Sequence, residues 1–441
     1  MNDFEIRAIR IADLFGVIPL HNIELREGGI TFIHGPNGCG KTTCLRLIDA
    51  VFNWEISVLF EIQFSWLEIE KSGGEVLKVT KTLRERDSRH VAELSFNQGR
   101  NKEYTIKPGK DLVRISPAEI EEYVPSLVRV GAREWMDRND GRKFEFNDVI
   151  KKYIYQFQPS LNKERPEWLD KFIKSVNLHF IKTQRLLKVD YSSVRRHRPE
   201  ESTIAEVINL YSNEIKDSIN KKLAEQAAMS QGHDRSFPQR LLSLSIDNTV
   251  SEDEIRAEYA STEKKIQKLV EAGLIDKQDN IALPQKKFED TERRVLWLYL
   301  NDVNKKLEVF DDIQNKIQTF LDLVGKKFKT KKFTVNREDG FSIHVNNKPN
   351  DALPPTQLSS GEQHQIVLFY ELIFKASENS FFLIDEPEIS LHVDWQRMFL
   401  SDIDKIAKLG NRQFLIATHS PQIIGNHRKL AVALNEGILD E

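Results

Sequence analysis

A glycine-rich segment near the start of the chain combines the residue types that bind phosphate. It matches the pattern G-x-x-x-x-G-K-[ST] and reads Gly35-Pro36-Asn37-Gly38-Cys39-Gly40-Lys41-Thr42, followed by Thr43. Glycines let backbone N–H groups close around phosphate oxygens, and a following helix adds partial positive charge. The Lys41 ammonium would reach the β- and γ-phosphates, and the Thr42 hydroxyl would ligate Mg²⁺. The segment therefore predicts a site for ATP and Mg²⁺, with these nine residues as nucleotide ligands.

A second segment places two carboxylates directly after a short apolar run, Phe381-Phe382-Leu383-Ile384. Such a run is typical of a buried strand, and ligands of parallel sheets bind where the strands end. We predict that Asp385 holds Mg²⁺ through its water shell. Glu386 would orient or deprotonate the attacking water, as a general base does. Taken alone, the pair could also be two ordinary capping acids.

Two further segments carry polar residues at the ends of apolar runs. Leu358-Ser359-Ser360-Gly361-Glu362-Gln363 precedes an apolar helical run, so it is a good helix cap that presents N–H groups and hydroxyls to an anion. The apolar run from Phe414 to Ala417 leads into Thr418-His419-Ser420-Pro421. A lone histidine is usually structural, but one at a strand end after the Asp-Glu strand indicates a γ-phosphate sensor.

Taken in order, and with Ser390-Leu391-His392-Val393-Asp394 included, these segments resemble the ATPase head of the ABC class. The narrower resemblance is to the branch that holds RecF, the SMC proteins and the OLD nucleases. The matching motifs lie in roughly residues 1–60, 178–188 and 333–425. This resemblance implies an α/β fold, namely an ABC-type P-loop ATPase head with a helical, short coiled-coil insertion, and an enzyme that hydrolyses ATP.

The same resemblance implies roles for residues that the residue types alone leave open. Ser359, Ser360, Gly361 and Glu362 would contact the γ-phosphate of ATP bound to a second subunit, and Asp394 would belong to the loop that crosses the dimer interface. His419 would be the switch residue. Gln184, just past the predicted strand Leu178–Ile181, would touch both Mg²⁺ and the attacking water. The chain would thus form an ATP-sandwiched dimer or a higher homo-oligomer.

The spacing of the motifs indicates which ABC-type ATPases the chain resembles. Lys41 and Ser359 are 318 positions apart, which is longer than in transporter ATPases and shorter than in zinc-hook repair ATPases. Only 22 residues follow His419, so the Toprim nuclease domain of OLD nucleases is expected on a separate protein. The chain therefore resembles the stand-alone ATPases of anti-phage systems. Gln184-Arg185-Leu186 and the phosphate-loop region favour the AriA subunits of PARIS systems over the PtuA subunits of Septu systems.

That resemblance implies a multimeric ATPase scaffold that holds a Toprim-like or HNH nuclease effector until a phage-encoded trigger appears. Two other functions stay open. One is a RecF-like repair ATPase that clamps duplex DNA, and the other is a nucleotide-gated scaffold with little turnover. Glu386 argues against the last, because a pure binding module needs no base at that position.

The spacing of apolar residues predicts the helices and strands that must position these residues. We predict strands at 6–11, 18–25 and 30–33, a helix at 41–52 and antiparallel strands between 58 and 106. Helices follow from about 201, the last of them continuous from 287 to 324, and strands return at 333–345. The predicted division is 1–189 and 326–441 for the two halves of the head, with a helical insertion at 190–325. The insertion is either a lid that packs on itself or a protruding hairpin that docks another protein.

Composition excludes several classes of protein. Charge nearly balances, with 64 Lys+Arg against 67 Asp+Glu, and no stretch approaches the roughly 20 apolar residues of a membrane span. A uniformly basic nucleic-acid coat is excluded as well. Two cysteines cannot form a disulfide framework or a zinc site, and no secretory segment is seen, so we expect a cytoplasmic protein. Two basic stretches could be solvated charge or could contact DNA phosphates: Arg195-Arg196-His197-Arg198, and Lys326, Lys327, Lys329, Lys331 and Lys332.

Overall fold

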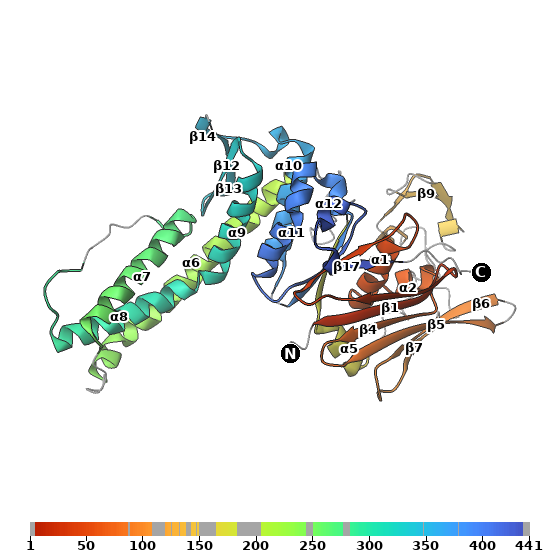
Figure 1. Ribbon diagram of the computed structural model, residues 1–441, viewed down its shortest axis with the longest axis horizontal. Helices are drawn as coiled ribbons and strands as arrows, with labels where there is room; N and C mark the ends of the chain where they lie inside the picture. The colour runs from red at the N-terminus through yellow and green to blue at the C-terminus, as the bar shows by residue number, and fades with distance from the viewer. Residues whose placement is uncertain are drawn as a thin grey trace. The chain divides into compact units, whose positions relative to one another are not determined.

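The structure is a computed structural model that describes residues 5–86, 89–107, 120–124, 126–131, 133–137, 143–146, 148–149, 165–182, 204–243, 250–276, 283–346, 348–377 and 379–434. The chain divides into two compact units (Figure 1). The sheet unit comprises residues 1–183, 376–389 and 396–441, and the helical unit comprises 184–375 and 390–395. This division groups 326–375 with the helices, and the domain boundaries at 190 and 325 stay a prediction.

A parallel sheet forms the centre of the sheet unit. Its five strands lie in the order β11 (Asn177–Ile181), β15 (Ser380–Asp385), β16 (Gln413–Ala417), β3 (Ile30–His34) and β17 (Ala431–Ala433). All neighbouring strands are parallel, and β16 is buried along its whole length. Short apolar runs are expected for strands buried on both faces. The predicted strands at 30–33, 178–181, 381–384 and 414–417 are confirmed, and their carboxyl ends meet at one edge.

An antiparallel sheet in the same unit confirms the strands predicted at 6–25 and most of those at 58–106. Its order is β2 (Ile18–Glu24), β1 (Ile6–Leu14), β4 (Trp66–Lys71), β5 (Val76–Arg86), β6 (Arg89–Asn97) and β7 (Tyr104–Ile106). The start of the 58–106 region was predicted wrongly, because Ile56–Glu61 form a helix, α2. The ammonium of Lys81 donates to the carbonyls of Leu59, Phe60 and Ile62 at 3.2, 2.7 and 2.7 Å, which caps this helix at its carboxyl end.

One hydrophobic core joins the two sheets and the helix α1 (Lys41–Phe52). Leu45 and Ile48 of α1, Leu67 of β4 and Leu383 of β15 belong to it and are fully buried. The predicted helix bounds are confirmed, because apolar residues fall on the face that the sheets cover. Helix α5 (Glu167–Lys174) packs on the same core. The unit also contains the short elements α3 (Ile120–Tyr123), β8 (Leu127–Arg129), β9 (Glu134–Asp137), β10 (Lys143–Glu145), α12 (Pro421–Ile424) and η6 (Arg428–Leu430).

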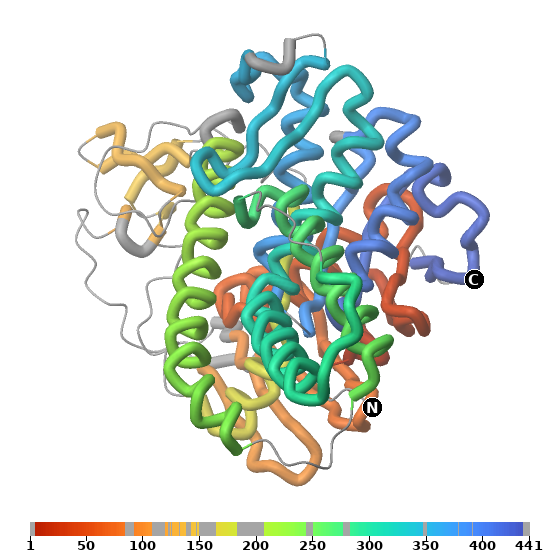
Figure 2. The backbone as a smooth tube through the Cα atoms, turned by 90° about the vertical axis from the view of Figure 1, so that its left-hand side faces the viewer, coloured from red at the N-terminus to blue at the C-terminus, as the bar shows by residue number. Residues whose placement is uncertain are grey.

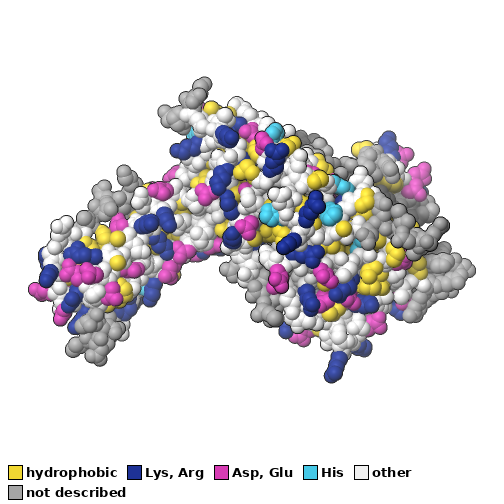
Figure 3. Space-filling model, in the orientation of Figure 1, with side chains coloured by type: hydrophobic (Ala, Val, Ile, Leu, Met, Phe, Trp, Pro, Cys, Tyr) yellow, Lys and Arg dark blue, Asp and Glu magenta, His cyan; other side chains and the backbone are white. Residues whose placement is uncertain are grey.

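The helical unit contains the helices α6 (Ile204–Leu242), α7 (Glu252–Glu271), α8 (Asp290–Glu308) and α9 (Asp311–Lys327), and α8 packs against both α6 and α7. The continuous helix predicted from 287 to 324 is wrong, because it is interrupted at Val309 and Phe310. The Phe310 N–H bonds the carbonyl of Leu307, a tighter turn than an α-helix has, and the Phe310 ring is buried. On the face seen in Figure 3, basic and acidic side chains interleave over these helices.

A strand hairpin closes over the first half of α6 (Figure 2). It consists of β12 (Lys331–Asn336) and β13 (Gly340–Val345), as predicted, with β14 (Lys348–Ala352) added. The Ser212 hydroxyl of α6 lies 2.8 Å from the carbonyls of Asp339 and Phe341. Gly340 is required here, because it has φ +78° and a Cβ would lie 1.9 Å from the Ser212 carbonyl oxygen.

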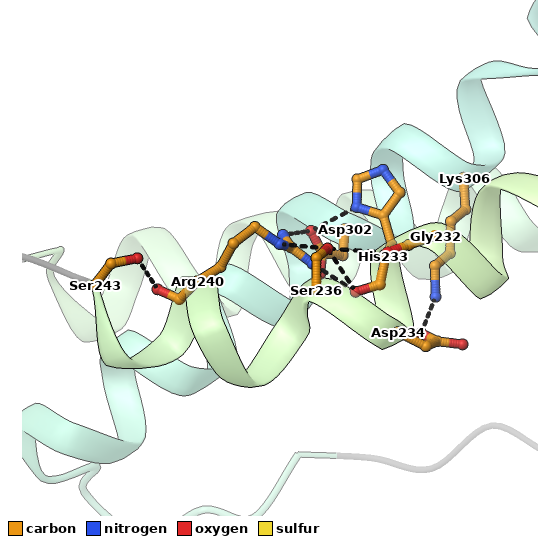
Figure 4. A network of polar contacts seen from close by, with 8 residues as sticks. All are labelled: Gly232, His233, Asp234, Ser236, Arg240, Ser243, Asp302 and Lys306. Carbon is orange, nitrogen blue, oxygen red and sulfur yellow. Dashed lines mark hydrogen bonds and ion pairs between the residues drawn. The ribbon is translucent and has the colours of Figure 1, made fainter.

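A partly buried ion pair joins α6 to α8 (Figure 4). The Arg240 guanidinium donates to both carboxylate oxygens of Asp302 at 2.5 and 2.6 Å, and Asp302 is 4% exposed. Arg240 also donates to the carbonyl of His233, in the turn that precedes the helix-interior Pro238. A bidentate pair of this kind specifies one register of the two helices. Among the described residues, no helix is both long enough and apolar enough to cross a membrane.

Candidate functional site

The glycine-rich loop connects β3 to α1 in the conformation that a phosphate loop needs. Gly38 and Gly40 have φ of +89° and +86°, and α1 begins directly after Gly40. At Gly35, a Cβ would lie 2.6 Å from the carbonyl oxygen of Leu434. Nε2 of the buried His21 donates to the carbonyl of Cys39 at 2.9 Å, and burial lowers the pKa of His21. A side chain from outside the loop therefore fixes the loop backbone by a hydrogen bond, and the loop amides lie at the start of a helix.

Lys41 lies across this loop and is only 5% exposed. Its ammonium donates to the carbonyls of Gly35 and Pro36, at 2.9 Å each, and lies 3.7 Å from the sulfur of Cys39. The positive charge is thus concentrated within the loop, which is the place where phosphate oxygens would need it.

Two predicted metal ligands from distant parts of the chain meet next to the loop. The Thr42 hydroxyl donates to Oδ1 of Asp385 at 3.0 Å. Burial raises the pKa of Asp385 and the nearby carboxylates of Glu386 and Glu388 raise it further, while Thr42 and Lys41 oppose this. A hydroxyl and a carboxylate are oxygen donors that Mg²⁺ prefers, so this donor set fits the ion. Among the described residues, no group of three or more His, Cys, Asp or Glu forms a metal site.

The predicted base and the predicted switch residue also meet. Oε1 of Glu386 lies 3.2 Å from Nε2 of His419, and both side chains remain about one-third exposed. Glu386 has φ +45°, and its N–H bonds the carbonyl of Ala417 at 2.8 Å. A left-handed conformation at a residue other than glycine is strained, and such strain concentrates at functional sites.

The predicted anion-binding segment lies in the helical unit at the start of α10 (Ser360–Tyr370), which continues into the π-helix η4 (Glu371–Lys375). Ser359 caps α10, with its N–H and hydroxyl both 2.9 Å from Oε2 of Glu362. Lys331 lies 2.5 Å from the other Glu362 oxygen. Burial raises the pKa of Glu362, but the bonds from Lys331 and Ser359 outweigh it and leave the pKa below its usual value. Ser360 and Gly361 form the first turn of α10.

Other predicted site residues have a more open setting or lie outside the described residues. Asp394, at the start of α11 (Val393–Ala407), is exposed. Thr43 follows Thr42 in the first turn of α1. Gln184 and the basic stretch 195–198 fall outside the residues that the structure describes. Asp394 therefore lies on an accessible surface, and the role of Gln184 stays a prediction.

Sequence reasoning missed one residue that borders the phosphate loop. Phe15 follows β1 in a left-handed conformation with φ +60° and is 40% exposed. Its Cε2 atom would lie 3.3 Å from a Cβ added at Gly40, so its ring stands beside the loop. The sequence carried no signal for this role, because the exposure of Phe15 and its positive φ are properties of the fold.

Comparison with known proteins identifies a family for the chain. The family model described as an AAA ATPase domain matches residues 15–424, which covers most of the chain. Short stretches match the UvrABC system protein A, with 39% identity over 71 residues in Oceanobacillus iheyensis and 35% over 63 residues in Clostridium acetobutylicum. The chain matches only 7% of the length of each of these proteins.

Solved structures give distant similarities over nearly the whole chain. The Smc head domain of Pyrococcus furiosus, solved with an extended coiled coil and bound to the C-terminal domain of ScpA, has 13% identity and a TM-score of 0.37. That alignment covers 98% of this chain and 94% of the other. The SMC head domain from Thermotoga maritima has 10% identity and a TM-score of 0.32, with 98% and 97% covered.

Proposed function

Since the chain belongs to the family of the AAA ATPase domain, we propose that it binds ATP with Mg²⁺ and hydrolyses the ATP to ADP and phosphate. The predicted fold class is confirmed as an α/β, ABC-type P-loop ATPase head with a helical insertion. The observation that carries the proposal is the meeting of Thr42 with Asp385, at 3.0 Å, beside the Glu386–His419 pair.

Each residue of the site has a distinct task in this reaction. The loop amides and Lys41 bind the β- and γ-phosphates, and Thr42 and Asp385 hold Mg²⁺ directly or through water. When bound, Mg²⁺ supplies positive charge that neutralises the phosphate oxygens. Glu386 orients the attacking water and accepts its proton, while His419 fixes the Glu386 carboxylate and contacts the γ-phosphate. Catalysis by such a site comes mainly from positioning and from charge stabilisation.

Phe15 gives the site a surface for the adenine base of ATP. An exposed aromatic ring beside a phosphate loop offers a flat face on which adenine can stack. The strained φ of Phe15 supports a functional role, because a bulky residue adopts the left-handed region only where the fold holds it there. We therefore include Phe15 among the proposed nucleotide-binding residues.

A second copy of the chain would complete the site. The capped start of α10 presents Ser359, Ser360 and Gly361, which matches the resemblance to heads that contact the γ-phosphate across a dimer. Asp394 would face the same interface. In this arrangement ATP links two copies and hydrolysis releases them.

The experiment that tests the proposal measures phosphate release from ATP by the purified chain, with Mg²⁺ and with the metal chelated. The expected result is Mg²⁺-dependent turnover that the variant K41A loses. The matched control is E70Q, which changes a partly buried carboxylate that Arg7 and Arg10 bind on the antiparallel sheet. Absence of turnover with ATP binding intact would instead support the nucleotide-gated scaffold.

The wider role rests on the resemblance of the motifs to stand-alone anti-phage ATPases. We propose that the assembled chain scaffolds a separate Toprim-like or HNH nuclease and releases it on a phage-encoded signal. Purification together with the product of a neighbouring gene tests this, because the expected result is a stable complex. A lone dimer that forms with ATP and binds duplex DNA would favour the RecF-like repair function, for which the exposed Lys326, Lys329 and Lys332 offer charge.

A further inference from the structure

Glu388 lies two residues after Glu386, in the short helix η5 (Pro387–Ser390). The proposed reaction assigns no role to it. Its Oε1 oxygen accepts three hydrogen bonds from one stretch of chain. The donors are the Thr418 hydroxyl at 2.9 Å, the His419 N–H at 2.5 Å and the Ser420 N–H at 3.1 Å. A single carboxylate oxygen therefore holds the whole segment that carries the switch histidine.

A second set of bonds closes a ring around this contact. The Ser420 hydroxyl donates to Oε1 of Gln396 at 2.8 Å, and Nε2 of Gln396 donates back to the Glu388 carbonyl at 3.4 Å. Thr418 is fully buried, and its N–H bonds the carbonyl of Ile33, at the end of β3 just before the phosphate loop. The ends of β15, β16 and β3 are thus joined through the segment that Glu388 binds.

The chemistry of this contact is unusual for a purely structural one. The other oxygen of Glu388, Oε2, is buried and has no hydrogen-bond partner among the described residues. The carboxylate also stands near Asp385, since its charge raises the pKa of that acid. A neutral amide would avoid the repulsion between the two carboxylates and still offer an oxygen acceptor, although its NH₂ group would then be buried in the place of Oε2. A carboxylate at this position therefore indicates a need for strong, charge-assisted bonds to the backbone of the switch segment.

We propose that Glu388 is a positioning residue that holds the backbone of His419, so that the imidazole stays on the Glu386 carboxylate. Two of its three bonds go to the N–H groups of His419 and Ser420, and the His419 side chain itself is partly exposed. Within the described part of the chain, Glu386 is the one polar partner of that imidazole, so its place depends on the backbone beneath it. The role rests on the proposed ATP hydrolysis and acts through His419 alone.

The test is a double-mutant cycle on the full chain, measuring kcat for ATP hydrolysis and Kd for a non-hydrolysable ATP analogue. The variants are E388Q, E388A, H419A and E388Q/H419A, with E70Q as the matched control and thermal unfolding as the check on folding. Residues that act as one unit give effects that do not add.

The expected result is that E388Q lowers kcat about tenfold, E388A lowers it further, and both keep Kd within about threefold of wild type. In the H419A background, E388Q has no additional effect. Equal losses of kcat in both backgrounds would overturn the role, and so would an E388Q variant with unchanged kcat. A wild-type chain without turnover would contradict the proposed function itself, an outcome that is distinct from these two.

Discussion

Oε1 of Glu386 and Nε2 of His419 lie 3.2 Å apart although they end two different strands, β15 and β16. Parallel pairing brings Asp385 opposite Ala417, so the polar residues that follow each strand must meet at the carboxyl edge. The contact is therefore a consequence of sheet register, and Glu386 reaches it in a left-handed conformation with φ +45°. Asp385, the last residue of β15, accepts a hydrogen bond from Thr42, so the proposed base, the proposed switch residue and a proposed metal ligand lie at one edge of the sheet.

Replacing the proposed base should separate binding from hydrolysis. We expect E386Q to lower the rate of phosphate release about 10²–10⁴-fold, because an amide cannot accept the proton of the attacking water. Binding of ATP, measured by calorimetry, should stay within a fewfold of wild type, since the Gln side chain keeps its size. E70Q should match wild type in both assays. Unchanged turnover in E386Q would remove Glu386 from its role.

The strain at Glu386 predicts a conflict between stability and activity. Glycine adopts a positive φ without steric cost, so E386G should raise the free energy of unfolding by about 1 kcal/mol while turnover is lost. Urea unfolding measures the first quantity, and phosphate release measures the second. E386A is the control, since it removes the carboxylate but keeps the Cβ that causes the strain. If E386G and E386A had equal stability, the positive φ would carry no cost.

Phe15 gives a prediction about the base of the nucleotide. F15A should weaken ATP binding by about 1–3 kcal/mol, the contribution of one base stacked on an aromatic ring. Inorganic triphosphate, which has no base, should bind F15A and wild type equally well, and F15Y should restore ATP binding. Calorimetric titration of both ligands makes the comparison. Equal losses for ATP and triphosphate would mean that Phe15 supports the phosphate loop instead.

The sequence predicted those parts of the fold and site that depend on local chemistry. The helix Lys41–Phe52 follows from its apolar face, and Ser359 caps α10 as the segment before that helix predicted. The contact of Thr42 with Asp385 was expected from two motifs that each end a buried strand. The first two features need no knowledge of distant contacts, and the third follows because buried parallel strands end at one edge of a sheet.

The features that were missed depend on contacts from far along the chain. The apolar positions continue across Val309 and Phe310, so no periodic signal marks the break between α8 and α9. Lys81 caps α2 from a strand that comes some twenty residues later. Glu388 received no predicted role, because its donors lie in the segment after β16. Tertiary contacts, which a pattern cannot contain, decide each of these cases.

The pair of Lys331 and Glu362 predicts a dependence on pH. The folded-state pKa of Glu362 lies below the ordinary value of 4.5, so its ionised form stabilises the fold above that pH. The stabilisation is lost as the pH falls through the lowered value. E362Q keeps the cap on α10, because Gln serves there too, but loses the charge. We expect wild type to be more stable than E362Q at pH 7 and the two urea midpoints to converge on acidification. A difference that does not change with pH would contradict this.

The ion pair between α6 and α8 predicts a loss of stability in the helical unit. Asp302 has a 6% exposed side chain and accepts both bonds of the Arg240 guanidinium, which is itself 30% exposed, so D302A removes the carboxylate partner of a half-buried cation. We expect D302A to lower the free energy of unfolding by about 1–2 kcal/mol. The control is D234N, on the same pair of helices, whose exposed bond to Lys306 should matter by less than about 0.5 kcal/mol. The double variant R240M/D302A should recover part of the loss, because no unpaired charge remains. If D302A and D234N destabilise the chain equally in urea, the Arg240–Asp302 pair does not fix the two helices.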